Sequence, residues 1–166
     1  MPGLTTLGVF HTAFALVALV FGFLALVRYK EISPRNRSGS VYILTTAVTA
    51  ATSLGIYQHG GFGPQHIFAI LTLVALGVGT LGALTTLFGV SSRYVQAISF
   101  STTILLHLIP GVTEMLTRLP LGHPLVTSYS APVLKVALLL LLVAFVVGLA
   151  LQIRWLRASS QFANQK

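Results

Sequence analysis

Histidine is the side chain on which any chemistry of this sequence depends. The chain has five histidines, two acidic residues and no cysteine. Without cysteine, thiol catalysis and thiolate metal ligands are excluded, whereas imidazoles can ligate haem iron or another metal and relay protons. Threading the apolar segments as alternating membrane spans places one group of residues in the outer half: His11, His59, His66, His107, His123 and Glu114. This asymmetry predicts a site on that side.

His11 and His107 form the strongest candidate pair. His11 lies about two helical turns from the outer end of its span, and His107 lies nearly three turns from the outer end of its own. Two neutral imidazoles at matched depth on facing helices can hold a haem iron, bind another metal, or relay protons with Glu114. The alternative is structural, with each ring hydrogen-bonded to a carbonyl or hydroxyl of a neighbouring helix.

A polar stripe runs along the segment that carries His107. Its members recur at spacings of three or four residues: Thr103, His107, Gly111, Glu114 and Arg118, with Ser99 extending it inward. Ionisable residues inside a membrane are costly and usually face the bundle interior, so Glu114 is a candidate functional carboxylate. An ion pair between Glu114 and Arg118, one turn apart, is an equally open explanation. Pro110 removes a helix hydrogen bond and should kink or loosen the helix.

The remaining histidines fit a metal site less well. His66 begins an apolar segment and follows His59 by seven residues. A structural zinc site without cysteine would need three or four histidines, and this spacing matches no compact ligand motif. His66 can instead cap its helix or lie at the mouth of the site. His123, between Gly122 and Pro124, is expected in a solvent-facing loop.

Five apolar segments must position these side chains. Each has about 17–25 mostly apolar residues, the length that a helix needs to cross roughly 30 Å of hydrocarbon. Only 7% of the residues are charged and 55% are hydrophobic, against about 25% charged residues in soluble domains, and the mean hydropathy is +0.90. The sequence therefore predicts an all-α, polytopic membrane protein with a single domain over residues 1–166. Its bundle of five transmembrane helices is expected at 4–27, 41–57, 66–90, 94–117 and 131–155.

The basic residues encode topology. Eight of the ten Lys and Arg residues fall on one side of a five-span arrangement: Arg28, Lys30, Arg35, Arg37, Arg93, Arg154, Arg157 and Lys166. Only Arg118 and Lys135 lie toward the other side. By the positive-inside rule the N-terminus is outside and the C-terminus inside, in the bacterial inner membrane. The net charge of +8 therefore indicates topology and attraction to anionic inner-leaflet lipid, with no nucleic-acid partner.

Small and hydroxyl residues indicate how the helices pack. Small residues recur four apart in three segments: Ala18 and Gly22, then Ala75, Gly79 and Ala83, then Ala144 and Gly148. Such faces let helix backbones approach closely in lipid. The hydroxyls of Thr45, Thr49 and Thr52 share one face and are expected to bond to their own backbone or across helices, with a polar solute path as the alternative. The short connection 91–93 predicts antiparallel neighbours, and 118–130 predicts a folded-over loop.

Two stretches carry a resemblance to a known family. Gly60 to His66 reads GGFGPQH and leads into an apolar segment, and Gly39 with Tyr42 follows a basic loop. Together with His11, this pattern resembles, over most of the chain, a family of small bacterial membrane proteins catalogued only as a domain of unknown function. The family often has a histidine followed by arginine before that glycine, whereas this chain reads RNRS over 35–38. The resemblance implies no activity. A looser likeness to multi-helix cytochromes b rests only on the intramembrane histidines.

Two hypotheses of function follow. The first is a redox or cofactor-binding membrane protein, with haem b as the possible cofactor. His11 and His107 would be its ligands, with His66 nearby and Glu114 as a proton partner. The second is a non-catalytic accessory subunit or assembly factor, which packs against a membrane-protein partner or a second copy. A small transporter or proton path is a third. Hydrolase chemistry is not expected, because Glu31 lies on the inner loop and cannot pair with Glu114.

Overall fold

The computed structural model describes residues 5–57, 61–120 and 122–163, which form helices and no strands. The α-helices are α1 (Thr6–Tyr29), α2 (Arg37–Leu54), α3 (Pro64–Leu84), α4 (Ser92–Arg118) and α5 (Pro132–Ala163), and a single 3-10 turn, η1 (Gly89–Ser91), precedes α4. The all-α prediction with five helices is confirmed.

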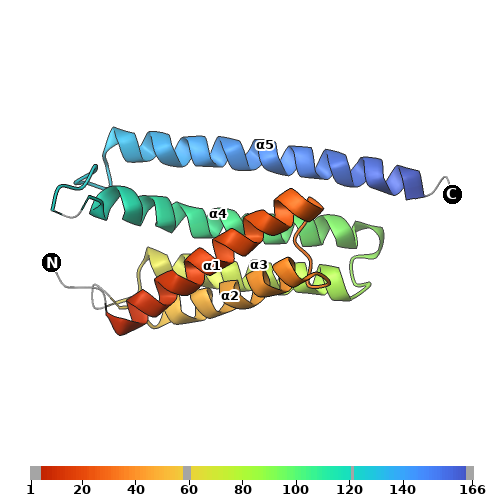
Figure 1. Cartoon of the computed structure of the whole chain (residues 1–166), viewed down its shortest axis with the longest axis horizontal. Coiled ribbons are helices and arrows are strands. Elements are labelled where there is room, and N and C mark those ends of the chain that lie inside the picture. Colours follow the sequence, from red (N-terminus) through yellow and green to blue (C-terminus); the bar gives the residue numbers. More distant parts are fainter. Residues whose placement is uncertain (1–4, 58–60, 121, 164–166) are drawn as a thin grey trace.

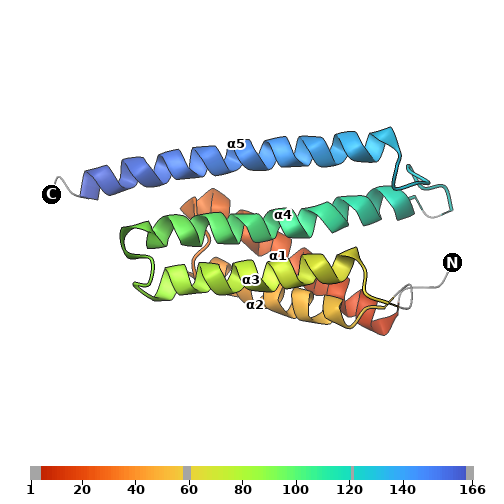
Figure 2. The ribbon, with the colours of Figure 1, turned by 180° about the vertical axis from the view of Figure 1, so that it is seen from behind.

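The helices run alternately up and down and form a bundle in which chain neighbours pack together (Figures 1 and 2). α1 packs along α2, α2 along α3, and α3 along α4, which confirms the antiparallel pairing of the third and fourth segments. α1 also crosses α4 obliquely, so the two helices separate toward the N-terminal end of α1. α5 lies outside, along α4.

Within the described residues, four helical segments are long and apolar enough to cross a membrane: Thr6–Tyr29, Pro64–Leu84, Gly89–Arg118 and Pro132–Gln161. α2 has 18 residues and is not among them, because hydroxyl residues lower its hydropathy. Those hydroxyls bond largely to carbonyls of their own helix, as expected: Thr45 to Val41, Thr49 to Thr45, and Thr52 to Val48.

Several helix boundaries differ from the predicted ones, because capping groups rather than apolar runs end the helices. α2 begins at Arg37, earlier than predicted, since the Asn36 side chain accepts the Gly39 N–H at 2.8 Å. α3 ends at Leu84 instead of residue 90; an extended Thr85 and Gly89, with φ of +51°, turn the chain there. The connection to α4 is therefore longer than predicted. α4 continues as one helix through Pro110.

Close contacts form where two of the predicted small-residue faces lie. Gly22 of α1 faces the ring of Tyr42, which is fully buried, and Gly79 of α3 faces the ring of Phe100 on α4. The small-residue face of α5 differs, because Ala144 and Gly148 are exposed and a Cβ at Gly148 would meet nothing within 4 Å. Small residues thus explain the close α1–α2 and α3–α4 contacts, but they do not explain how α5 packs against α4.

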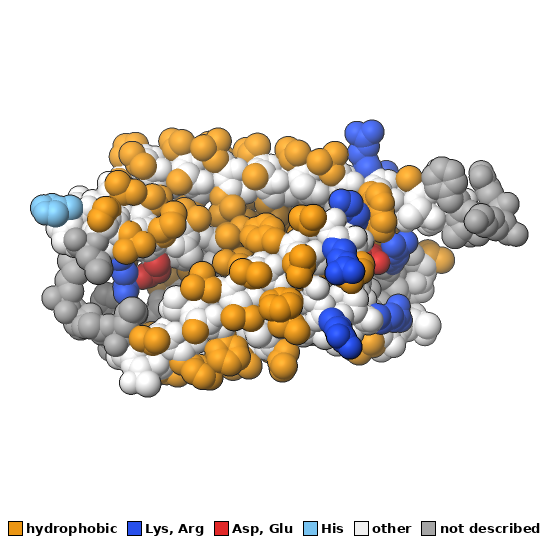
Figure 3. Space-filling model, in the orientation of Figure 1, with side chains coloured by type: hydrophobic (Ala, Val, Ile, Leu, Met, Phe, Trp, Pro, Cys, Tyr) orange, Lys and Arg blue, Asp and Glu red, His pale blue; other side chains and the backbone are white. Residues whose placement is uncertain are grey.

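The two ends of the bundle have different polar character. Lys and Arg gather where α1 and α5 end (Figure 3), the side predicted to be basic. At the opposite end the connection after α4 folds back, as predicted: the Val126 N–H donates to the Leu116 carbonyl at 3.0 Å, and Val126 is buried.

Candidate functional site

His11 is fixed on α1 by a carbonyl of α2. Its Nδ1 lies 3.0 Å from the Thr49 carbonyl oxygen and 3.2 Å from Thr52 Oγ1. The Thr52 hydroxyl donates its own proton within α2, to the carbonyls of Val48 and Thr49. Both partners of the imidazole therefore act as acceptors, and the proton of neutral His11 belongs on Nδ1.

His107 is fixed in the same manner by its own helix. Its Nδ1 lies 3.1 Å from the Thr103 carbonyl oxygen, which also requires a proton on Nδ1. The Nε2 atom is buried and has no hydrogen-bond partner among the residues that the structure describes. A buried lone pair without a partner costs free energy, so this nitrogen calls for a ligand.

The contact between α1 and α4 gives a reference point for the positions of the two histidines. α1 and α4 approach closely near Gly22, where an added Cβ would be 3.3 Å from Ile104 Cδ1. His11 lies about three turns before Gly22 along α1, and His107 one turn after Ile104 along α4. Counted from that contact, His11 lies about two turns farther along the bundle than His107, on the stretch where the helices separate, so the matched depth suggested by the sequence stays a prediction.

Tyr42 connects this pair to the bundle core. Its hydroxyl bonds to the Thr103 hydroxyl at 2.5 Å, and Thr103 in turn donates to the Phe100 carbonyl at 2.7 Å. Both side chains are fully buried. Since the Thr103 carbonyl holds the His107 ring, Tyr42 fixes the helical turn that positions His107. The sequence singled out Tyr42 only through the family-like pattern.

His66 has the opposite proton arrangement. It is buried at the start of α3, where its Nδ1 accepts the Gly63 N–H at 3.0 Å, and the rings of Tyr57 and Phe62 pack against it. Accepting on Nδ1 puts the proton of a neutral ring on Nε2. In this state neither nitrogen offers a lone pair to a metal, so His66 acts as the helix cap that the sequence allowed.

Glu114 forms the ion pair with Arg118 that was one of its two expected roles. Both side chains are roughly half exposed, and the stripe turns outward here, since Gly111 is exposed as well. The His123 position is exposed in the loop after α4, as expected. His59 lies outside the described residues. Within the described chain no three His, Cys, Asp or Glu side chains come together to hold a metal.

A second polar cluster occupies the basic end of the bundle. Arg93 pairs with both carboxylate oxygens of Glu31, from Nε at 3.0 Å and Nη2 at 3.3 Å, and donates to Ser159 Oγ at 3.1 Å. Its guanidinium also lies over the Trp155 ring. The sequence predicts only a topological role for these basic residues and gives no signal for their contacts, because Glu31 and Arg93 lie 62 positions apart and nothing local pairs them.

No family model, curated protein or solved structure matches the chain. The resemblance to the family of unknown function stays a prediction. The geometry of the histidine pair is the basis for assigning a function.

Proposed function

We propose that the protein is a membrane haem protein in which His11 and His107 would hold a b-type haem. The observation that carries the proposal is the buried Nε2 of His107, which has no hydrogen-bond partner among the described residues. Imidazole ligated through Nε2 is a common arrangement for haem iron.

The surrounding contacts support ligation rather than a purely structural role. A histidine that binds a metal usually donates its other ring N–H to a carbonyl or carboxylate, which sets the tautomer and raises ligand basicity. Both His11 and His107 have this contact, to the carbonyls of Thr49 and Thr103. The structural alternative accounts for Nδ1 in each ring but leaves Nε2 of His107 unexplained. A haem held by two histidines has no open coordination position, which favours electron transfer.

His66 and Glu114 are outside the proposed ligand set. The proton arrangement of His66 does not suit a metal, and the Glu114 carboxylate is held by Arg118. Glu114 is therefore not a proposed haem ligand. We propose for it only the role of a proton partner at the outer surface. Within the described residues, no third side chain of a metal-ligating type (His, Cys, Asp or Glu) joins His11 and His107. A bare metal ion such as zinc usually needs at least three protein ligands, so the two histidines favour haem.

The membrane arrangement belongs to the same proposal. α2 is placed as a fifth span because it lies alongside α1 and α3 and its 18 residues extend about 27 Å. The segregation of Lys and Arg then puts the N-terminus outside and the C-terminus inside, in the inner membrane of a bacterium. In that orientation a haem held by these histidines would lie toward the outer face.

The test is a visible spectrum of the protein purified in mild detergent after expression with added haem. A Soret band with sharp reduced α and β bands is expected in the wild type, at one haem per chain. His11→Ala and His107→Ala should each remove the low-spin spectrum, whereas His123→Ala, an exposed histidine, should leave it unchanged. Helical circular dichroism and gel filtration check that the variants are folded. A featureless wild-type spectrum, or haem retained in both pair variants, would refute the proposal.

One observation favours the accessory-subunit alternative. α5 leaves its predicted contact face, Ala144 and Gly148, uncovered in the single chain, and such faces serve helix association in lipid. A featureless spectrum, combined with stable co-purification of a larger membrane complex that Gly148→Leu disrupts, would replace the haem proposal with this function.

A further inference from the structure

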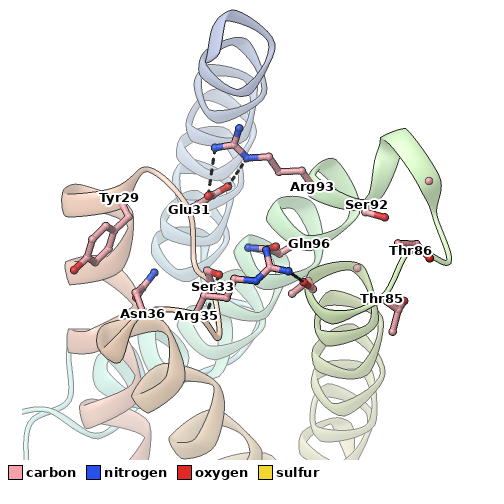
Figure 4. A pocket seen from close by; sticks show the side chains of 13 residues that line it. Tyr29, Glu31, Ser33, Arg35, Asn36, Thr85, Thr86, Ser92, Arg93 and Gln96 are labelled. Atoms are coloured by element: carbon pink, nitrogen blue, oxygen red, sulfur yellow. Dashed lines mark hydrogen bonds and ion pairs between the residues drawn. The ribbon is translucent and has the colours of Figure 1, made fainter. Parts of the chain in front are cut away.

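A cavity of about 510 Å³ opens at the basic end of the bundle, far along α4 from His107 (Figure 4). It lies between the α1–α2 loop, the C-terminal end of α3 and the first turns of α4. The side chains that matter for its chemistry are those of Glu31, Arg35, Thr86, Ser92, Arg93 and Gln96.

The single carboxylate of this cavity is already neutralised. Both oxygens of Glu31 accept hydrogen bonds from Arg93, a paired geometry that satisfies the acid and leaves further Arg93 N–H groups. Arg35 contributes a second guanidinium. It donates to the Ala83 carbonyl at 2.8 Å through Nη2, and this one contact uses a single donor of the five that an arginine carries. The lining therefore has a net positive charge.

The uncharged polar groups of the lining are hydroxyls and side-chain amides. Ser92 lines the cavity and its Oγ has no hydrogen-bond partner among the described residues, so a rotation of this side chain toward the cavity would offer its hydroxyl proton to a ligand without breaking an internal bond. Gln96 uses its amide nitrogen on the Ile32 carbonyl at 2.7 Å, and Thr86 presents a further hydroxyl at the rim. Two guanidinium groups and two hydroxyls around a paired acid call for a ligand rich in acceptor oxygens and negatively charged.

We propose that this cavity binds a phosphate group. Arg35 supplies the charge and Ser92 a hydroxyl bond, while the Glu31–Arg93 pair closes the site toward α5. The group is a phosphodiester of an anionic phospholipid headgroup or a free phosphate or phosphate monoester, since both present the same oxygens. The basic end of the bundle is where anionic inner-leaflet lipid is expected.

The experiment measures binding by the full chain in detergent, in two arms. In the first, native mass spectrometry and thermal stability report titration with phosphatidylglycerol, against phosphatidylcholine. In the second, thermal stability and calorimetry report titration with inorganic phosphate and glycerol phosphate. Arg35→Gln should weaken binding about tenfold or more. Arg37→Gln is the matched control, because it removes the same charge from the same end without lining the cavity, and should change affinity less than about twofold.

Arg35→Gln also removes the hydrogen bond to the Ala83 carbonyl and can lower the stability of the protein. Ser92→Ala is therefore a second test variant. Its hydroxyl makes no internal bond among the described residues, so its removal should weaken binding several-fold at unchanged stability. Binding of lipid alone, or of soluble phosphate also, supports the site and identifies the source of the phosphate. Absence of binding in both arms, or equal losses in Arg35→Gln and Arg37→Gln, would overturn the proposal in favour of diffuse charge attraction.

Discussion

Gly22 is the position where a single methyl group should disturb the bundle most informatively. A Cβ there would lie 2.7 Å from Cδ2 and 2.8 Å from Cε2 of Tyr42, and 3.3 Å from Ile104 Cδ1. The Tyr42 ring cannot turn away freely, because it is fully buried and its hydroxyl is bonded to Thr103. Ordinary carbon contacts are about 3.5–4.0 Å, so α1 has to move outward by roughly 1 Å.

The magnitude follows from a comparison with a second glycine. Extra methylenes in a packed core cost about 1–3 kcal/mol, and replacing a helical glycine by alanine contributes up to about 1 kcal/mol in the opposite direction. Gly148→Ala is the matched control: it lies within α5, where a Cβ would meet nothing within 4 Å. The propensity gain is common to both variants, so Gly22→Ala should be less stable than Gly148→Ala by about 1–3 kcal/mol.

The assay is thermal unfolding in one detergent, followed by gel filtration of the protein that survives heating. For a chain of this size about 2–4 °C corresponds to 1 kcal/mol, so the midpoint of Gly22→Ala should lie roughly 2–12 °C below that of Gly148→Ala. Equal midpoints would refute the reasoning, because they would mean that α1 does not pack on the Tyr42 ring as the structure shows.

The two ion pairs should differ in strength. In a double-mutant cycle of Glu31→Gln and Arg93→Gln, we expect a coupling energy of about 1 kcal/mol, the upper end of the range for partly exposed ion pairs. The reason is that two Arg93 nitrogens contact the carboxylate and that the Glu31 side chain is only 20% exposed. A coupling energy near zero in thermal unfolding would contradict this. Glu114→Gln removes a one-turn pair that is about half exposed, so its stability should stay within about 0.5 kcal/mol of wild type. A larger loss would show that Glu114 is buried in the membrane-embedded protein.

The helices could be predicted from the sequence because apolar length is a local property. Even α2, whose threonines lower its hydropathy, is helical, since each of these hydroxyls returns a hydrogen bond to its own backbone. The positions where the helices end were predicted less well. Residues 85–90 are apolar enough to extend α3, but Thr85 is extended and ends the helix, and Gly89 turns the chain four residues later. Hydropathy does not register either feature.

The site was predicted as residue types but not as contacts. Counting turns in the sequence predicts a matched depth for His11 and His107, whereas the proton position on His11 depends on the Thr49 carbonyl, 38 positions away. His66 shows why this matters. It has the same ring and a buried position, yet the Gly63 N–H imposes the proton arrangement that does not suit ligation. The Glu31–Arg93 pair joins the α1–α2 loop to the first turn of α4, which only packing brings together.

α4 explains why the two proposed sites can be tested separately. Ser92 begins the helix and His107 follows 15 residues later, a separation of about 22 Å along the axis. Substitutions more than about 10 Å apart without shared partners usually act additively. The phosphate-binding cavity relies on Arg35 and the first turn of α4, while the histidine pair relies on Thr49 and Thr103. Loss of haem in His107→Ala together with unchanged phosphate affinity would therefore mean a local loss of the ligand rather than collapse of the bundle.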